Sequence, residues 1–200
     1  ALIFAGTPAF DRVLGRATRA TDGPRMGLER WGNDNLTGIA HDRDSHVAYD
    51  AEINEQSLRF RSLKLAALQK TLKAPRVCGD AKGDLLVIGW GSTKGAIEEA
   101  VEAMRAEGHQ VSSLHLQFLQ PLPPGIKEIM LGFGKVMTIE SNWSDRPEDP
   151  IIDENNRRYS ALAILLRARY LVDIDCWSEV RGEPIKPGTI RRVMMEKLKK

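Results

Sequence analysis

The sequence predicts an α/β fold in which helices cover both faces of a mostly parallel sheet. From about residue 83 onward, short apolar runs alternate with helical patterns, which is typical of βαβ units. One of these runs, Leu85–Ile88, is continuously apolar, as in a central strand covered on both faces. The chain has 200 residues, and a chain of this size buries roughly 70% of the surface that its unfolded form exposes. One sizeable core is therefore expected.

The composition excludes several classes of protein. Hydrophobic residues make up 42% of the chain and charged residues 28%, with a net charge of +2, as in ordinary globular proteins and too little charge to attract nucleic acid. The longest apolar runs, 85–88 and 161–166, fall far short of the roughly 20 residues that a membrane span needs. Cys78 and Cys176 are too few for a zinc site or an iron–sulfur cluster. We therefore expect no membrane span, no metal site and a reduced, cytoplasmic setting.

The first 82 residues precede the alternating pattern. Residues 1–50 scatter Gly, Pro, Asp and Asn among short apolar pieces without a period, which predicts an irregular segment. From Glu52 to Lys73, apolar residues recur at near-helical spacing and predict a long helix. Pro75 ends this helix, and a linker follows. The expected domain organisation is an irregular segment at 1–50, a linker helix and linker at 51–82, and an α/β domain at 83–200.

Within the α/β domain, each expected element has its own signal. Ile97, Ala100, Val101 and Met104 mark one face of a helix that stops at Gly108. The alternating run 111–118 predicts the next strand, which Pro121 prevents from continuing. The same reasoning gives the later elements: a short helix at 125–131, a strand at 135–140, a loop at 142–156, a helix with Leu162, Leu165, Leu166 and Ala168 inward, a strand at 170–174, an edge hairpin or extended stretch at 178–186, and a helix at 187–199.

A glycine-rich turn at 89–95 separates the first strand of this domain from its helix. Backbone N–H groups at such a turn could hold an anion such as a phosphate. Its spacing, G-x-G-x-x-x-G with Trp90 between the first two glycines, is not that of the dinucleotide fingerprint. The favoured interpretation is a tight turn in which Ser92 or Thr93 caps the helix, and the anion site stays open as the alternative.

The carboxyl ends of parallel strands meet at one edge of a sheet, where polar sites commonly lie. This places six residues in one candidate contact or anion site: Gly91, Ser92, Thr93, Gln120, Glu140 and Asn142. We expect the Glu140 carboxylate at the mouth of the sheet rather than in the core. Since no His, Cys or second carboxylate is clearly paired with it, a cap or an inter-domain hydrogen bond is favoured over catalysis, and no catalytic residue is assigned.

The segment His41–His46 contains two imidazoles and two carboxylates, which raises the question of a metal site. It lacks the H-x-x-x-H spacing and a predicted helix that would hold two histidines on one face. A polar surface loop is therefore the favoured interpretation.

Several stretches in order resemble one family. They are Thr37–Asp42 with His46 and Tyr49-Asp50, Gly83–Gly95, His115–Pro123, Glu140 with Asn142, and Leu165–Arg167 with Tyr170. Together these motifs, over residues 37–186, resemble the C-terminal region of alpha subunits of 2-oxoacid:ferredoxin oxidoreductases, especially those acting on 2-oxoglutarate. Residues 1–36 match nothing in that pattern, and the loop 141–156 looks longer than the family's link into its last helix.

The resemblance implies a fold like the transketolase C-terminal domain, a three-layer α/β/α sandwich on a mostly parallel five-stranded sheet. It implies no cofactor bound by this chain alone; thiamine diphosphate, Mg²⁺, an iron–sulfur cluster and coenzyme A would belong to the whole complex. Its partners would be the beta subunit, the N-terminal pyrimidine-binding domain of the alpha subunit, and ferredoxin. Two alternatives remain: a non-catalytic module that binds an anion or coenzyme A at 91–93, and a free-standing small enzyme that uses Glu140.

Overall fold

The structure is a computed structural model that describes residues 48–199. The chain divides into two compact units, of which the first comprises residues up to 73 together with 120–122. Its helix α2 (Ala51–Gln69) begins where the Asp50 carboxylate accepts hydrogen bonds from the N–H groups of Glu52 at 2.8 Å and Ile53 at 3.2 Å. The predicted long helix is confirmed, although it ends four residues before Lys73. Within this unit, Gln69 Nε2 donates to the Leu122 carbonyl at 2.8 Å.

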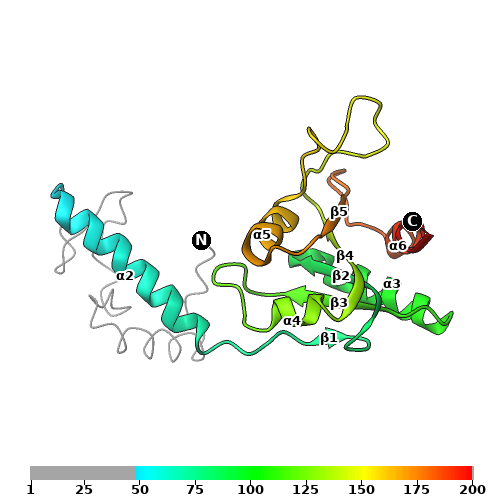
Figure 1. The fold of residues 1–200 in the computed structure, drawn as a ribbon, viewed down its shortest axis with the longest axis horizontal. Helices are drawn as coiled ribbons and strands as arrows, with labels where there is room; N and C mark the ends of the chain where they lie inside the picture. The colour runs from blue at the N-terminus through cyan, green and yellow to red at the C-terminus, as the bar shows by residue number, and fades with distance from the viewer. Residues whose placement is uncertain (1–47, 200) are drawn as a thin grey trace. The chain divides into compact units, whose positions relative to one another are not determined.

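The second unit, residues 74–119 and 123–200, contains one five-stranded sheet (Figure 1). The strand order is β1-β3-β2-β4-β5. The bounds are β1 Val77–Cys78, β2 Gly83–Trp90, β3 Val111–Leu116, β4 Phe133–Glu140 and β5 Asp175–Ser178. β1 is antiparallel to β3, and all other pairs are parallel. The predicted fold class, a mostly parallel five-stranded sheet in an α/β protein, is confirmed.

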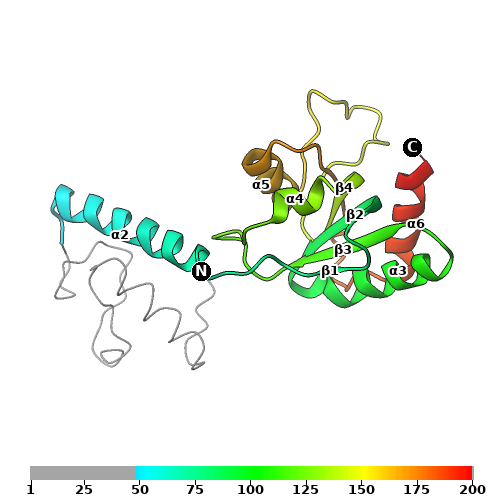
Figure 2. The same cartoon turned by 60° about the horizontal axis from the view of Figure 1, so that its bottom comes forward.

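Helices cover both faces of this sheet (Figure 2). One layer consists of α3 (Lys94–Ala106) and α6 (Pro187–Lys199), which pack on each other and on the sheet. The other consists of α4 (Ile126–Met130) and α5 (Ala161–Tyr170). The short 3₁₀ turn η2 (Gly91–Thr93) joins β2 to α3.

The central strand β2 shows why the sheet lies between the two layers. Successive side chains of a strand point to opposite faces, and Leu85 and Val87 belong to the core shared with α3 and α6. Leu86 and Ile88 point to the opposite face, and all four side chains are fully buried. The continuous apolar run therefore marks a strand covered on both sides, as predicted.

Four local predictions differ from the structure. The strand expected at 170–174 is absent, because α5 runs to Tyr170 and ends at Leu171, whose φ is 54°; the last strand begins at Asp175. The stretch 178–186, expected as an edge hairpin or extended stretch, forms no hairpin and contributes only Ser178 to a strand, and Ala168 is exposed rather than inward. The expected linker contains the edge strand β1. A short apolar run fits helix and strand equally well. Periodicity alone therefore misplaced the boundary between α5 and the last strand.

Candidate functional site

Glu140, the last residue of β4, is fully buried. The expectation that its carboxylate lies at the mouth of the sheet was therefore wrong. The side chains of β4 alternate, and that of Glu140 points to the same face as Thr138, toward α5. A buried carboxylate is stable only when its oxygens are hydrogen-bonded or paired with a cation, so its partners decide what this residue does.

The partners of Glu140 show that it caps α5 from another element. The N–H groups of Leu162 and Ala163, in the first turn of α5, donate to its two oxygens at 2.9 and 3.3 Å. Ser160 precedes the helix but makes no side-chain cap bond; its hydroxyl instead donates to Glu140. The positive end of the helix dipole also favours a negative charge here. These contacts are those of a cap, one of the two interpretations that the sequence favoured.

The same carboxylate joins the ends of two neighbouring strands. Trp90, the last residue of β2, donates its indole N–H to Glu140 Oε2 at 3.4 Å, and Asn142 Nδ2 donates to the same oxygen at 3.0 Å. Thr138 Oγ1 donates to Oε1 at 2.9 Å. These donors are all neutral groups, and none is a nucleophile or a base positioned for proton transfer. The arrangement links the ends of β2 and β4 to the first turn of α5.

The turn at 91–93 lies beside this cluster, but its hydroxyl groups do not cap α3. Thr93 is buried, and its Oγ1 donates back to the Trp90 carbonyl at 2.9 Å, while Ser92 is exposed. Thr93 occupies the N-cap position of α3, as predicted, but its side chain makes no capping hydrogen bond. A Cβ at Gly89 would lie 2.4 Å from Ile97 Cδ1 and 2.7 Å from Thr93 Oγ1, so these side chains would have to move. Gly91 has a φ of 61°, a conformation that favours glycine.

Five of the six predicted site residues therefore gather where β2 and β4 end: Gly91, Ser92, Thr93, Glu140 and Asn142. The sixth, Gln120, is exposed and belongs to the first unit. The Asn142 Oδ1 atom is buried and has no hydrogen-bond partner in the part of the chain that the structure describes. The rule that the carboxyl ends of parallel strands meet at one edge of a sheet, here called the strand-end rule, thus brought the correct residues of neighbouring parallel strands together. The rule does not predict that residues 120–122, in the loop after β3, belong to the same compact unit as α2.

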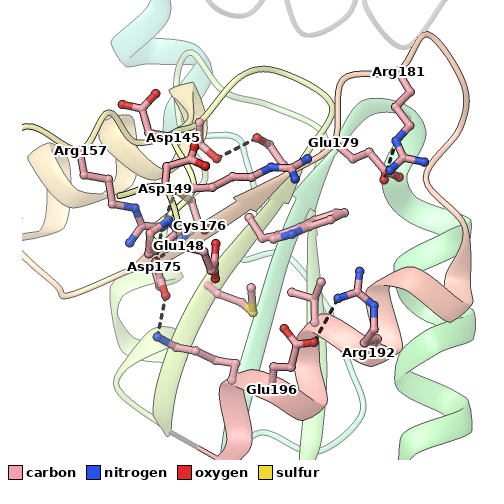
Figure 3. A pocket seen from close by; sticks show the side chains of 18 residues that line it. Asp145, Glu148, Asp149, Arg157, Asp175, Cys176, Glu179, Arg181, Arg192 and Glu196 are labelled. Atoms are coloured by element: carbon pink, nitrogen blue, oxygen red, sulfur yellow. Dashed lines mark hydrogen bonds and ion pairs between the residues drawn. The ribbon is translucent and has the colours of Figure 1, made fainter. Parts of the chain in front are cut away.

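A second polar region was not predicted from the sequence. A cavity of about 480 Å³ lies beside the edge strand β5, and Trp177 is one of the residues that line it (Figure 3). Its walls come from the loop after β4, from β5 and from α6. The charged lining residues are Asp145, Arg146, Glu148, Asp149, Arg157, Asp175, Glu179, Arg181, Arg192, Glu196 and Lys197. The only signal in the sequence was the unusual length of this loop, because β5 and α6 contribute their charges from 30 to 50 residues further along the chain.

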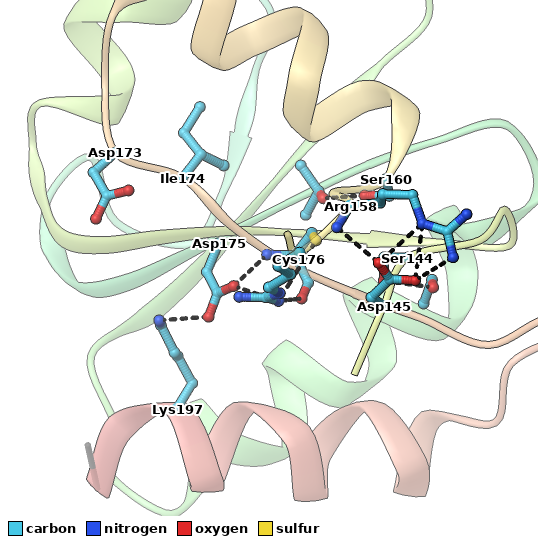
Figure 4. Close-up of polar contacts among 12 residues, drawn as sticks. Ser144, Asp145, Arg158, Ser160, Asp173, Ile174, Asp175, Cys176 and Lys197 are labelled. Atoms are coloured by element: carbon cyan, nitrogen blue, oxygen red, sulfur yellow. Dashed lines mark hydrogen bonds and ion pairs between the residues drawn. The ribbon is translucent and has the colours of Figure 1, made fainter. Parts of the chain in front are cut away.

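Asp145 anchors the loop that walls this cavity (Figure 4). Arg158 holds it with Nη2 at 2.8 Å from Oδ1 and Nε at 3.0 Å from Oδ2, and the Arg158 N–H donates to Oδ2 at 2.8 Å. The Trp143 indole N–H adds a bond of 3.0 Å to Oδ1. These contacts, above all those from the Arg158 side chain, hold the pKa of Asp145 far below its usual range. The carboxylate is therefore ionised throughout the neutral range.

Asp175, at the start of β5, is the second fixed carboxylate of the cavity. Lys197 Nζ lies 2.7 Å from its Oδ2, and Arg157 Nη2 lies 2.9 Å from its Oδ1. Burial opposes ionisation of Asp175, but the hydrogen bonds from Lys197 and from the Cys176 N–H outweigh it and lower the pKa. Arg157 also donates to the Cys176 carbonyl at 3.0 Å and stacks over the Tyr159 ring at 4.7 Å. The charges near Asp175 are thus mostly paired with one another.

Two further features of the described residues bear on the kind of site. Residues 48–199 contain no group of three or more His, Cys, Asp or Glu side chains that could hold a metal ion. Their helices also include none with the length and apolar character needed to cross a membrane. The His41–His46 segment, considered above for metal binding, lies outside the described residues.

The chain has curated relatives of one kind. It is 31% identical over 137 residues to the 2-oxoglutarate oxidoreductase subunit KorA of Mycobacterium tuberculosis, a match that covers 68% of this chain and 18% of the relative. It is 26% identical over 168 residues to the alpha subunit of 2-oxoacid:ferredoxin oxidoreductase 2 of Aeropyrum pernix, covering 80% of this chain and 24% of the relative. The chain thus spans about a fifth of the length of these relatives. No protein-family model matches it.

A solved structure has a similar fold. The 2-oxoglutarate:ferredoxin oxidoreductase of Magnetococcus marinus, determined with 2-oxoglutarate, coenzyme A and succinyl-CoA bound, superposes with a TM-score of 0.63. The match covers 83% of this chain and 27% of that chain at 23% sequence identity, so it supports the fold alone. The sequence relatives confirm the family resemblance inferred above, because they are alpha subunits of 2-oxoacid:ferredoxin oxidoreductases.

Proposed function

We propose that this chain, whose relatives are alpha subunits of 2-oxoacid:ferredoxin oxidoreductases, supplies the C-terminal domain of such a subunit and has a structural role in its assembly. The observation that carries the proposal is the 31% identity to one alpha subunit over two thirds of the chain. The Glu140 cluster supports the structural role, because its donors are neutral and its bonds tie β2, β4 and α5 together. The domain boundaries proposed from the sequence, at residues 51 and 83, belong to this hypothesis.

The reaction of the complete enzyme would be the oxidative decarboxylation of a 2-oxoacid such as 2-oxoglutarate to its acyl-CoA. By family resemblance, thiamine diphosphate with Mg²⁺, the iron–sulfur cluster and the coenzyme A chemistry belong to the pyrimidine-binding domain and the beta subunit. Ferredoxin would accept the electrons, and the complex would work in the cytoplasm. Two features of this chain agree with that division: it has only two cysteines, where a cluster needs about four, and its buried carboxylate Glu140 caps a helix.

Affinity purification from the native source tests the proposal. A tag at the C-terminus of the chromosomal copy would recover the chain, and mass spectrometry would identify the proteins that accompany it and the intact mass of the tagged polypeptide. We expect a thiamine- and cluster-binding beta subunit in the eluate, together with reduction of a viologen dye that depends on both a 2-oxoacid and coenzyme A. An untagged strain is the control for background proteins.

Two outcomes would contradict the proposal. Recovery of a 22.3 kDa polypeptide without partners would favour a detached module. Calorimetric titration with coenzyme A would then test binding at residues 91–93. Recovery of the complex without 2-oxoacid-dependent dye reduction would instead separate the assembly from the proposed reaction.

A further inference from the structure

The side of α5 that points away from the sheet is apolar. Ala161, Ile164 and Ala168 are exposed and recur at the spacing that places residues on one side of a helix. Leu171, at the C-terminal end of the helix, continues this spacing; it is 89% exposed and Ile164 is 53% exposed. We call these four residues the outer face of α5. The buried residues of the helix are Leu162, Ala163 and Leu166. A helix that is apolar on opposite sides is typical of one that is covered on both.

The outer face of α5 differs from the other exposed surfaces of this unit. On the corresponding side, α6 exposes charged residues such as Arg191 and Arg192. Large apolar side chains are also exposed at Leu131, Ile151 and Val180, but each lies outside the helices and strands and belongs to no periodic set. Single exposed apolar residues are normal on a protein surface, whereas a continuous apolar side of a helix marks an interaction site.

The order of side-chain sizes along the outer face indicates what covers it. Small and large residues alternate, as Ala161, Ile164, Ala168 and Leu171, at spacings of three, four and three residues, which is the seam spacing of paired helices. If a second copy of this face lies antiparallel on the first, position 164 of one copy is opposite 168 of the other, and 161 is opposite 171. Every large side chain then meets an alanine, as close packing requires. A parallel pair in the same register would place Ile against Ile and Ala against Ala.

The residues beside the outer face are compatible with such a pair. Arg167 flanks the face on one side, so two copies would bring two arginines close together. This guanidinium, however, already lies 2.6 Å from Asp173 of the same chain and stacks over the Tyr159 ring at 4.6 Å. On the other side the flanking residue is Leu165, which is apolar and half-buried. Two copies therefore meet with paired charges on one flank and carbon surface on the other.

We propose that the outer face of α5 is a contact between two copies of this chain, related by a two-fold axis and with their α5 helices antiparallel. The inference rests on the proposed function in one respect, namely that the two copies meet inside the assembled enzyme. The face contributes four residues from each copy, whereas a standard interface has roughly 20–30 residues a side. The contact is therefore one part of the interface between two alpha subunits and does not hold two free domains together.

Cysteine cross-linking in the complete assembly tests this proposal. In Ala168→Cys, the two sulfurs of the antiparallel pair are offset by about 6 Å along the helix axis, within reach of the short reagent bismaleimidoethane. Ala161→Cys is the control on the same face, because its two sulfurs would be about 15 Å apart along the axis. Ala103→Cys is the control on α3, where Ala103 is also exposed. The wild-type assembly shows the background from native cysteines.

We expect at least about five-fold more linked alpha-subunit dimer from Ala168→Cys than from either control, since the reagent bridges only nearby sulfurs. Mass spectrometry would identify the linked peptides, and a link between two residues 168 can join only two copies of the chain. The double variant Ala161→Cys/Leu171→Cys gives an independent test. It should form links between residue 161 of one copy and residue 171 of the other.

Three results would overturn the proposal. The first is the absence of a 168–168 link in an intact assembly. The second is a link from position 168 to the beta subunit or to another part of the alpha subunit, because the outer face would then have a different occupant. The third is equal linking at positions 161 and 168, which the antiparallel register excludes.

The two levels of the hypothesis fail in different ways. If the 168 positions link as expected but the assembly does not reduce dye with a 2-oxoacid and coenzyme A, the proposed reaction is wrong and the α5 contact stands. If the assembly is active but the 168 positions do not link, the function stands and the α5 contact is wrong.

Discussion

Two buried carboxylates close to the end of β4 are stabilised in opposite ways. Glu140 is fully buried, and its hydrogen-bond donors are neutral: hydroxyl, amide and indole groups and the backbone N–H groups of α5. Asp145 is 5% exposed and is held chiefly by the guanidinium of Arg158, whose own side chain is 75% exposed. The comparison teaches that one fold can compensate a negative charge with oriented dipoles or with a counter-ion, and the two solutions respond differently to mutation, acid and salt.

The largest expected effect comes from removing the charge at Glu140. In Glu140→Gln, one carboxylate oxygen becomes an NH₂ group that faces donors, so several buried donors lose their acceptor. We expect a loss of roughly 3 kcal/mol or more of unfolding free energy, since each unsatisfied buried group costs about 1–3 kcal/mol. Urea denaturation followed by circular dichroism measures it. Glu179→Gln, at a carboxylate paired with exposed Arg181, is the control and should change little. A similar small change at Glu140 would contradict the account.

A smaller effect is expected when one donor to Glu140 is removed. Thr138→Val keeps the shape of the side chain but deletes the hydroxyl that lies 2.9 Å from Glu140 Oε1. We expect a loss of about 1–2 kcal/mol of unfolding free energy, the value of one hydrogen bond to a charged group. The same urea experiment on Ser92→Ala, whose hydroxyl is exposed, gives the baseline. If Thr138→Val were as stable as the wild type, the remaining donors would be sufficient on their own.

The stabilisation by the Asp145–Arg158 pair should depend on pH in the acid range. Because the folded pKa of Asp145 is far below that of the unfolded chain, near 3.9, its ionisation stabilises the fold above that pH and the benefit is lost as the pH falls. Arg158→Ala removes the main cause of the low pKa. We therefore expect acid unfolding, followed by circular dichroism, to begin at a higher pH than in the wild type.

Arg169→Ala is the control for that experiment, because Arg169 is exposed on α5 and far from Asp145 in the sequence. It should leave the acid midpoint unchanged. An unchanged midpoint in Arg158→Ala would mean that the backbone N–H and the Trp143 indole suffice to hold Asp145 ionised.

The smallest expected effect is that of salt. At 1 M salt the screening length is about 3 Å, so the stability difference between wild type and Arg158→Ala should shrink, because the Arg158 side chain is largely exposed. The difference between wild type and Glu140→Gln should not change, since its donors are neutral and buried. Urea denaturation at low and high salt compares the two. Equal shrinkage of both differences would remove the distinction between the two carboxylates.

The fold could be predicted from the sequence to a large extent, because it depends on local periodicity. The apolar run 85–88 and the alternating helical patterns predicted the central strand and the parallel sheet correctly. The last strand was misplaced, since α5 continues through Arg167 and Tyr170, residues that suit a helix end as well as a strand. The helix ends at Leu171, whose backbone is left-handed, and a leucine at that position gives no sequence signal for a helix end.

The candidate site was predicted in part for a similar reason. The strand-end rule correctly brought together the turn after β2 and Glu140, because strand order alone places them there. It could not give the burial of Glu140, which follows from the position of α5 above β4. Nor could it find the cavity beside β5, whose paired charges Asp175 and Lys197 lie 22 residues apart in the chain.

The contacts of Asp175 and Arg157 also determine how the sheet can end. An unprotected edge strand offers free peptide groups on which another chain can add a strand, which leads to aggregation. At the β5 edge, the N–H of Cys176 is taken by Asp175 and its carbonyl by Arg157, and at the other edge β1 has only two residues. Neither edge strand therefore offers a long row of free peptide groups with which a sixth strand could pair. Strand addition at either edge of this sheet is therefore disfavoured.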